Sequence, residues 1–478
     1  MKWCFILNNA QYLMELLGKL SYQIIREGDE CVAIANCKIT EYDMRKYFPK
    51  DIKFLSKVDW CLKNYKKGQK IFDDFSWKEF FPSFDRKSRL KLLRFDFDKS
   101  VEMVSQIYQF VDYIFKSEKP DLFINEPPVD LFKEIIYHFC KKNKATYFGL
   151  MIMGLEKRVA VYDLEYTCSL YEKTFKQKLN LTEEEKKLVQ DLIKNFPSFP
   201  QPPSYMVESV SHFERVNLTE YYLKRIKKVY ESRLKYLLNR KKFKPFDYES
   251  ESILKSMVQA PLNAVERKIR ILLQSNIFEH LNNNDNFFLF PLHWQPECST
   301  SLQATYYCDQ LSTIRNIAFT LPFPYKLYVK EHPAAVGTRP GNFYKELKKI
   351  PNIVLIFPYE DGKNLIKKSQ GVIVLTSDMG TEAAFLGKLV YVLGEVFYSY
   401  HPFCRKVKNF EELRQKIKDD LNNRPNIGNL EDLNLRFLVS CFSNTFSGEL
   451  LFDSEKNDPN DYKEIYNSLK KIFYDLRK

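Results

Sequence analysis

The chain has 478 residues, of which 45% are hydrophobic and 15% aromatic. This length exceeds what one hydrophobic core usually supports, so we expect two domains. The formal net charge is +13, but no recognition motif for nucleic acid accompanies it, and we expect no nucleic-acid partner. A peripheral contact with an anionic membrane surface is still compatible with such a charge, because it needs only a basic face.

The cysteines and the first residues indicate a reducing compartment. The ten cysteines form no C-x-x-C pair, and most stand in apolar runs, as small core residues do. No secretory leader follows "MKWCFILNNAQ", and no apolar run is long enough to cross a bilayer. We therefore expect a cytoplasmic protein, and a position at the inner face of the membrane remains compatible with its charge.

Residues 1–165 show apolar strands that alternate with amphipathic helices. The pattern predicts the strands and helices of a parallel sheet that is covered on both faces, which describes a Rossmann-like domain. The stretch 48–95 is rich in aromatic residues and shows no such pattern. The predicted strands are "KWCFIL", "CVAIAN", "PDLFINEPP" (which runs into a loop) and "ATYFGLM", and the predicted helices span 11–30, 100–117 and 129–143.

Residues 166–284 differ in composition and predict a helical linker or insertion. "LTEEEKKLVQDLIKNF" (181–196) starts with Thr and acidic residues, which favour a helix N-terminus. A proline-rich break at 197–205 separates it from a long charged amphipathic helix over 217–242. The nearest approach to a basic block, "RLKYLLNRKKFK" (233–244), lies at the end of that helix.

From residue 285 to 450 the alternation of strands and helices returns, and it predicts a second Rossmann-like domain. We therefore expect an α/β protein in which two parallel sheets face each other across a cleft, while residues 451–478 form a helix that packs back on the first domain. The predicted strands are "NFFLFPL", "YKLYVKE", "NIVLIFP", "GVIVLT" and "LVYVLG", separated by helices over 301–319, 341–349, 362–369 and 381–387.

Polar residues follow three of these strands at their carboxyl ends. Ligands of parallel α/β sheets bind at this edge, so the convergence predicts a binding site in the second domain. The clusters are His293, Gln295 and Glu297 after the first strand; Lys330, Glu331 and His332 after the second; and Thr376, Ser377, Asp378, Gly380, Thr381 and Glu382 after the fourth.

The third cluster, "TSDMGTEA", joins a strand to a helix through hydroxyl groups and a glycine, which suits a phosphate cradle. Glu382 would accept hydrogen bonds from ribose hydroxyls, or would only cap the helix. His332 would donate to a phosphate oxygen, and Lys330 and Arg339 would balance its charge, unless His332 is a structural histidine and Lys330 is only solvated. The chain has no zinc-protease, nucleophile-elbow or Walker motif, and we expect no metal.

Three stretches, "FPLHWQPECSTS", "YVKEHPAAVGTRPGNFYKEL" and "GVIVLTSDMGTEAAFLGKLVYVLG", together resemble the bacterial capsule polysaccharide synthesis and export family, which includes transferases of 3-deoxy-manno-octulosonic acid (Kdo). The pairs Gln295-Pro296 and His332-Pro333 look like two motifs of that family. The second pair is also similar to one in bacterial sialyltransferases, where it lies at the CMP of the donor. The resemblance covers about 285–400.

The resemblance implies a GT-B fold and a metal-independent reaction, with a nucleotide-sugar donor bound by the C-terminal domain and no other cofactor. The donor contacts it implies are His293, Gln295, Lys330, His332, Arg339, Thr376, Ser377, Gly380, Thr381 and Glu382. One position departs from the family pattern T-G-T-x-G-x-E-A, because Asp378 stands where a small hydroxyl residue is usual. A carboxylate there would repel a phosphate unless a cation compensates it.

The expected function is a glycosyltransferase that moves a sugar, of the acidic Kdo or sialic-acid kind, from a CMP donor to a glycan or glycolipid acceptor. Glu126, at the end of "DLFIN", is the candidate catalytic base from the acceptor side, or else an exposed loop carboxylate. Arg158 is a candidate contact for an anionic acceptor or the donor carboxylate. The alternatives are a polyol-phosphate transferase with a CDP donor and a non-catalytic component that binds nucleotide sugars.

Overall fold

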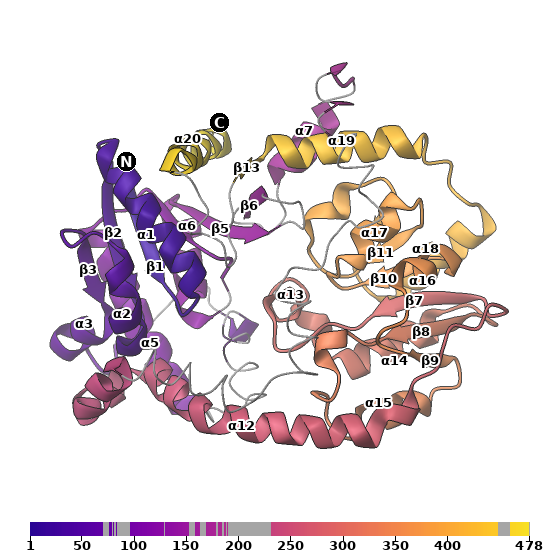
Figure 1. The fold of residues 1–478 in the computed structure, drawn as a ribbon, viewed down its shortest axis with the longest axis horizontal. Coiled ribbons are helices and arrows are strands. Elements are labelled where there is room, and N and C mark those ends of the chain that lie inside the picture. Colours follow the sequence, from indigo (N-terminus) through magenta and orange to yellow (C-terminus); the bar gives the residue numbers. More distant parts are fainter. Residues whose placement is uncertain are drawn as a thin grey trace. The chain divides into compact units, whose positions relative to one another are not determined.

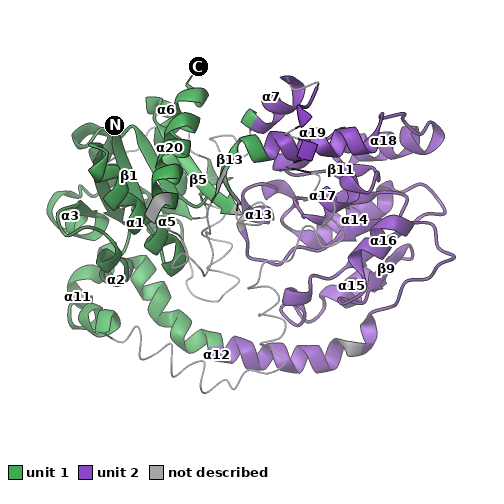
Figure 2. Cartoon of the chain, turned by 45° about the horizontal axis from the view of Figure 1, so that its top comes forward, with its two compact units in different colours: residues 1–170, 213–260, 442–478 green, residues 171–212, 261–441 purple. Residues whose placement is uncertain are grey.

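The structure is a computed structural model that describes residues 1–69, 76–78, 80, 83, 96–128, 130–152, 158–162, 169–177, 180–183, 186–187, 189, 231–447 and 459–477. Figure 1 shows the chain coloured along its sequence. The chain divides into two compact units, which Figure 2 colours green and purple. Unit 1 comprises Met1–Leu170, Phe213–Ala260 and Phe442–Lys478, and unit 2 comprises Tyr171–His212 and Pro261–Cys441.

Unit 1 is built on a seven-stranded sheet in the order β13-β6-β5-β4-β1-β2-β3. The five strands from β5 to β3 run parallel, whereas β6 and β13 pair antiparallel at one edge. The strands are β1 (Lys2–Leu7), β2 (Glu30–Ala35), β3 (Lys53–Ser56), β4 (Leu122–Asn125), β5 (Thr146–Ile152), β6 (Arg158–Tyr162) and β13 (Thr445–Ser447).

Helices cover both faces of this sheet, and the alternation of side chains along β1 shows how. Trp3 and Phe5 belong to the hydrophobic core beneath α1 and α20, whereas Cys4 and Ile6 belong to the core beneath α5 and α6. The helical elements of unit 1 are α1 (Gln11–Arg26), α2 (Lys38–Met44), η1 (Arg45–Tyr47), α3 (Lys57–Asn64), α5 (Phe97–Ser117), α6 (Leu131–Asn143), α11 (Arg240–Phe243), η3 (Lys244–Phe246), α20 (Pro459–Leu476) and the first part of α12 (Tyr248–Gln274).

Unit 2 is built on a six-stranded sheet in the order β12-β11-β10-β7-β8-β9, and every pairing in it is parallel. Numbered within the sheet, this is the Rossmann order, in which the chain starts at the centre, builds outward to one edge and then returns to build the other half. The point of reversal lies between β7 and β10. The strands are β7 (Phe287–Pro291), β8 (Lys326–Lys330), β9 (Ile353–Ile356), β10 (Val372–Val374), β11 (Val390–Val392) and β12 (Cys404–Lys406).

Several helices of unit 2 begin at a side chain that caps the first turn. The carboxylates of Asp309 and Asp361 and the amide oxygen of Asn409 accept hydrogen bonds from backbone N–H groups at the starts of α14, α16 and α18. The helical elements are α7 (Ser169–Gln177), η4 (Ser275–Ile277), α13 (Cys298–Ser301), η5 (Thr305–Tyr307), α14 (Gln310–Thr320), η6 (Pro333–Ala335), α15 (Phe343–Lys348), α16 (Gly362–Lys368), α17 (Met379–Phe385), η7 (Phe397–Tyr400), α18 (Phe410–Asn422) and α19 (Leu430–Ser443).

Two sheets of mainly parallel strands with helices on them confirm the predicted α/β class with two Rossmann-like domains. The short strands β3, β6, β12 and β13 were not predicted. Most of the predicted helix over 181–196 and most of the one over 217–242 lie outside the described residues. The stretch 166–284 forms no unit of its own, because the division between the units falls inside α12, between Ala260 and Pro261. The helix at the C-terminal end, α20, packs on α1 of unit 1.

Candidate functional site

In unit 2 the carboxyl ends of β7, β8 and β10 lie side by side, because these strands are neighbours in the sheet. Two hydrogen bonds join the polar residues that follow them. The backbone N–H of Thr376, after β10, donates to Nε2 of His293, after β7, over 3.4 Å. The guanidinium Nη2 of Arg339 donates to the backbone oxygen of His293 over 2.6 Å. The polar clusters predicted from the sequence therefore form one network at the point where the strand order reverses.

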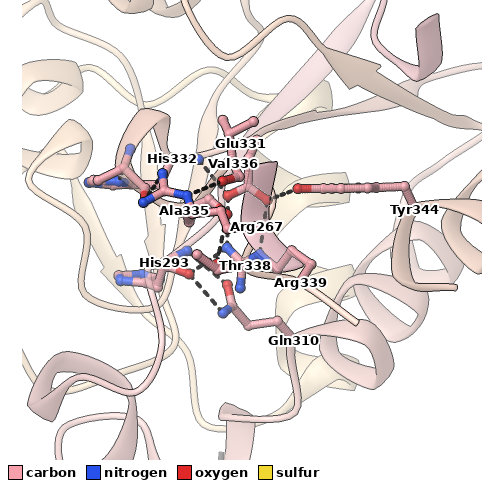
Figure 3. Close-up of polar contacts among 11 residues, drawn as sticks. Arg267, His293, Gln310, Glu331, His332, Ala335, Val336, Thr338, Arg339 and Tyr344 are labelled. Carbon is pink, nitrogen blue, oxygen red and sulfur yellow. Dashed lines mark hydrogen bonds and ion pairs between the residues drawn. The ribbon is translucent and has the colours of Figure 1, made fainter. Parts of the chain in front are cut away.

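Glu331 is the centre of this network (Figure 3). Its carboxylate is fully buried and accepts two hydrogen bonds from the Arg339 guanidinium, at 2.9 and 2.8 Å. The Tyr344 hydroxyl donates to it over 2.5 Å, and the backbone N–H of His332 donates over 2.6 Å. Four donors thus compensate the buried charge and hold the segment from 331 to 339 in one conformation.

His293 is a buried, neutral acceptor. Its backbone N–H donates to Oε1 of Gln310 over 2.8 Å, and Nε2 of Gln310 donates back to its backbone oxygen over 3.0 Å. Burial lowers the pKa of the imidazole to about 3, and the positive charges of His332 and Arg339 act in the same direction. The ring therefore stays uncharged at neutral pH, with Nε2 free to accept from Thr376.

His332 presents a hydrogen-bond donor at the edge of the sheet. It caps η6, since its Nδ1 accepts from the backbone N–H of Ala334 over 3.1 Å. Burial lowers the pKa of the ring; the Glu331 carboxylate opposes this effect, and the charges of Arg339 and Lys330 add to it. The neutral ring carries its proton on Nε2, because Nδ1 is the acceptor. Within the described residues no protein group accepts from Nε2.

The segment after β8 also packs against the C-terminal half of α12. Arg267 Nε donates to the backbone oxygen of Val336 over 2.7 Å, and its Nη2 donates to that of Ala334 over 2.8 Å. Gly337 lies with φ +76°, and a Cβ there would be 2.7 Å from the backbone oxygen of Arg267. Glycine is needed both for the left-handed backbone and for the close approach of the helix.

The turn between β10 and α17 is held by backbone contacts. Ser377 Oγ accepts from the N–H of Met379 over 3.3 Å, and the Ser377 backbone oxygen accepts from the Tyr398 hydroxyl over 2.5 Å. A Cβ on Gly380 would collide with that hydroxyl. The Thr381 hydroxyl is buried and has no hydrogen-bond partner among the described residues. These contacts hold the turn in place, and the Thr381 hydroxyl can still form a hydrogen bond with a ligand.

Carboxylates stand beside this turn. Burial raises the pKa of Glu382 to about 7, and the charges of Asp378 and Asp361 raise it further, while Lys363 and Lys330 oppose them. Burial also raises the pKa of Glu297, and Asp378 adds to this effect. Among the described residues, no group of three His, Cys, Asp or Glu side chains is arranged to hold a metal ion.

Three residues predicted to contact the donor already have partners within the protein. Lys330 is buried, and its ammonium donates to the Pro358 backbone oxygen over 2.6 Å. Gln295 Nε2 donates to the backbone oxygen of Cys308 over 2.7 Å. The Arg339 guanidinium, 6% exposed, is paired with Glu331. Their side chains shape the walls of the site, whereas His332 keeps a free donor.

In unit 1, Glu126 follows β4, again at the carboxyl end of a central parallel strand. Its Oε1 accepts from Asn8 Nδ2 over 3.0 Å and pairs with the buried Lys133 ammonium over 2.6 Å. Burial alone would lower the pKa of Lys133, but the carboxylates of Glu126 and Asp130 outweigh it and raise that pKa. No described residue donates to Oε2 of Glu126. Arg158 opens β6, and its side chain lies outside the described part of the structure.

Residues 193–420 match the model of the family described as capsule polysaccharide biosynthesis protein. The matched region makes up slightly less than half of the chain. It includes the complete strand-end network of unit 2, from His293 to Glu382. No curated protein matches the chain.

Among solved structures, the chain is similar to two Kdo transferases of Thermosulfurimonas dismutans KpsC. The β-Kdo 2,7-transferase shows 12% identity and a TM-score of 0.31, with 72% of this chain and 87% of that chain covered. The β-Kdo 2,4-transferase shows 14% identity and a TM-score of 0.31, with 68% and 80% covered. The UDP-GlcNAc 2-epimerase of Methanocaldococcus jannaschii, solved with UDP-GlcNAc and UDP, shows 12% identity and a TM-score of 0.26, with 92% and 99% covered.

Several residues that build the site in unit 2 do not follow from the sequence as members of it. Glu331 stands in the second polar cluster, but its place at the centre of the site does not follow from the sequence. Its partner Tyr344 lies in a helix with no unusual pattern. Gln310 and Arg267 stand inside helices, and Arg267 precedes the loop it holds by 69 residues. Of these four residues, only Glu331 could have been found from the sequence. A carboxylate directly after a buried strand, beside two cations, requires a partner.

Proposed function

We propose that this chain is a glycosyltransferase of capsule polysaccharide biosynthesis that takes its sugar from a nucleotide-activated donor. The observation that carries the proposal is the network at the carboxyl ends of β7, β8 and β10, inside the region that matches the family model. Nucleotides bind Rossmann-like sheets at this edge, next to the reversal of strand order. Hydrogen bonds within the protein fix the side chains of this network, as preorganisation requires.

The donor phosphate would lie against His332. Its Nε2–H is a directed donor held in place by the bond from Ala334 to Nδ1 and by the Glu331 network behind it. A hydrogen bond to a departing phosphate grows stronger as negative charge develops on the oxygen, which lowers the barrier to transfer. Because Arg339 and Lys330 are held within the protein, they would contribute through the field of their charges and not as direct ligands.

The donor we propose is a CMP-linked acidic sugar, and the acceptor is a glycan or glycolipid. The support is the similarity of Gln295-Pro296 and His332-Pro333 to the motif pairs of Kdo transferases and sialyltransferases. The carboxylates Glu297, Asp378 and Glu382 near the turn after β10 set a constraint, since they repel a second negative group unless they are protonated or hydrogen-bonded.

Removal of the proton from the acceptor hydroxyl would fall to Glu126. Oε1 is held by Asn8 and Lys133, which orients the carboxylate, and Oε2 is left to accept. The buried Lys133 ammonium holds this carboxylate in place, as a positioned general base requires. Glu126→Gln would then reduce the rate of transfer without loss of nucleotide binding.

Calorimetric titration with CMP, CDP, UDP, GDP and ADP tests the proposal. We expect selective binding of CMP, and a loss of about tenfold or more in affinity on His332→Asn, because a hydrogen bond to a charged group is removed. Asparagine is a good helix cap whose Oδ1 can replace Nδ1, so this variant keeps the cap and removes the Nε2 donor. The exposed His280, paired with Glu360, gives the control His280→Asn.

The other outcomes separate the alternatives. Selective binding of CDP would favour the polyol-phosphate transferase, and selective binding of UDP or GDP would keep the transferase and discard the acidic sugar. CMP binding by a correctly folded protein that transfers no sugar would point to the non-catalytic component. Binding of none of the five nucleotides would overturn the donor site.

A further inference from the structure

Unit 1 carries an exposed surface that the proposed reaction does not use. Residues 231–238 are helical, and three leucines on them are solvent-exposed: Leu234 by 42%, Leu237 by 47% and Leu238 by 79%. Lys241 and Lys242, in α11, and Lys244, in η3, follow directly and are exposed as well. We call these three leucines and three lysines the basic tip.

The leucines share one side of the helix, because positions i, i+3 and i+4 lie together. A shallow depression is lined by Leu237, Leu238, Asn239, Arg240, Lys241 and Lys242, so the apolar and basic side chains form one continuous surface. Within a few residues, this surface therefore presents both apolar and positively charged groups.

The opposite side of the same segment anchors it to unit 1. Tyr236 and Phe243 are buried in a hydrophobic cluster with Ile39 and Val58. Arg240 makes two hydrogen bonds to the Glu251 carboxylate, at 2.7 and 2.6 Å. The leucines are therefore held outward by a folded support.

Two cations near the tip interact with other side chains. Arg240 is paired with Glu251, and Lys235 lies 4.4 Å from the centre of the Tyr42 ring. Lys241 and Lys242 form no ion pair with any side chain that the structure describes. The free positive charge thus stands next to the exposed leucines.

We propose that the basic tip docks on the surface of an anionic lipid bilayer. The leucines would enter the boundary between headgroups and acyl chains, and the lysines would lie among the phosphates with their aliphatic stems along the leucines. The net charge of +13 adds a long-range attraction to the same surface. A nucleic acid would satisfy the lysines but leave the leucines in water, so the combination favours the lipid surface.

Among the described residues no helix is long and apolar enough to cross a membrane. The proposed contact is a docking on one leaflet. It is independent of the donor site, because its residues belong to unit 1 and the nucleotide network belongs to unit 2.

Sedimentation of the full chain with lipid vesicles tests the docking. We expect binding to vesicles of equal parts phosphatidylcholine and phosphatidylglycerol and little binding to phosphatidylcholine alone. The double variant K241E/K242E should lower the partition constant about tenfold or more, since each cation near the surface contributes about fivefold. The variant L237S/L238S keeps the charge and should also lower it.

The control is K67E/K367E, which makes the same change in net charge at two exposed lysines elsewhere on the chain. It should have a much smaller effect than K241E/K242E. Equal losses in both double variants, unchanged binding of L237S/L238S or no binding of the unmodified chain to the anionic vesicles would each overturn the proposal. Thermal unfolding of each variant distinguishes lost docking from lost folding.

Discussion

At the scale of single residues, the site depends on how buried charges are compensated. Glu331 and Arg339 lose their hydration together, and such a pair gives little net stability compared with apolar residues of similar size. What the pair contributes is a defined geometry, because the fork of the guanidinium and the Tyr344 hydroxyl fix the carboxylate. His332 follows directly in the chain, and its backbone N–H donates to that carboxylate, which fixes its position.

Removal of the Glu331 charge should be costly. Glu331→Gln leaves the buried Arg339 cation without its counter-ion, and we expect a loss of about 3 kcal/mol in the free energy of unfolding. Urea denaturation followed by circular dichroism measures this change. The matched variant Glu346→Gln removes a partner of the exposed Lys349 and should cost less than about 1 kcal/mol. Similar losses for the two variants would contradict the role given to Glu331.

The low pKa of His293 predicts a pH dependence of stability. The unfolded chain binds this proton near pH 6.5 and the folded chain only near pH 3. The contribution of His293 is therefore complete above pH 6.5 and is lost as the pH falls toward 3. Between pH 7.5 and pH 5 we expect a loss of about 2 kcal/mol from this residue.

Comparison with His293→Gln isolates this effect from the other titrating groups, among which Glu382 acts in the opposite direction. The glutamine oxygen can still accept from Thr376 N–H but cannot bind a proton in this range. The stability of the variant should thus fall less than that of the unmodified chain over the same interval. Parallel pH profiles in urea denaturation would show that His293 is not the titrating group.

At the scale of elements, the segment after β8 is held from two sides. The Glu331 network fixes it from within the sheet, and Arg267 of α12 fixes its backbone oxygens from outside. Gly337 allows the contact with α12, because its left-handed backbone and missing side chain leave room for the helix. The position of His332 thus depends on a helix that lies far away in the sequence.

Gly337→Ala tests this dependence. The left-handed backbone costs an alanine about 1 kcal/mol or more, and the new Cβ would press on the Arg267 backbone oxygen. We expect a lower unfolding temperature and weaker nucleotide binding, since the His332 loop would shift. Gly341→Ala is the control, because a Cβ there meets nothing within 4 Å. An unchanged nucleotide affinity in Gly337→Ala would show that the position of the His332 loop does not depend on its contact with α12.

At the scale of the whole molecule, distant parts of the chain complete unit 1. The strand β13 pairs with β6, and α20 packs against α1 and the core under β1. The Tyr466 hydroxyl donates to Asp29 over 2.9 Å, which ties the helix to the turn before β2. The last described residues therefore belong to the same fold as the first strand.

Leu469→Ala measures the contribution of α20. Leu469 is fully buried in the core that α20 shares with α1, and the substitution should cost about 3 kcal/mol through lost burial and the cavity it leaves. Lys471→Ala on the exposed side of the same helix should change stability by less than about 0.5 kcal/mol. Equal effects in denaturant unfolding would mean that α20 does not stabilise unit 1.

Some features followed from local patterns and others did not. The apolar runs of β7, β8 and β10 predict strands, and parallel strands place the residues after them at one edge, so the neighbourhood of His293, His332 and Thr376 could be predicted. The partners of Lys330 and Arg339 could not, because the Pro358 carbonyl and the Glu331 carboxylate reach them only after burial. Whether a cation faces a ligand or the protein interior depends on those contacts.

The sequence by itself determined the α/β class and the strands that carry the polar clusters, because hydrophobic periodicity and the polar residues at strand ends are local properties of the chain. Only the tertiary structure decided that β6 and β13 close the first sheet, that Arg267 holds the His332 loop and that Glu331 is the centre of the site. These contacts join residues far apart in the chain, and their energy arises from burial and hydrogen bonds that exist only once the parts have come together.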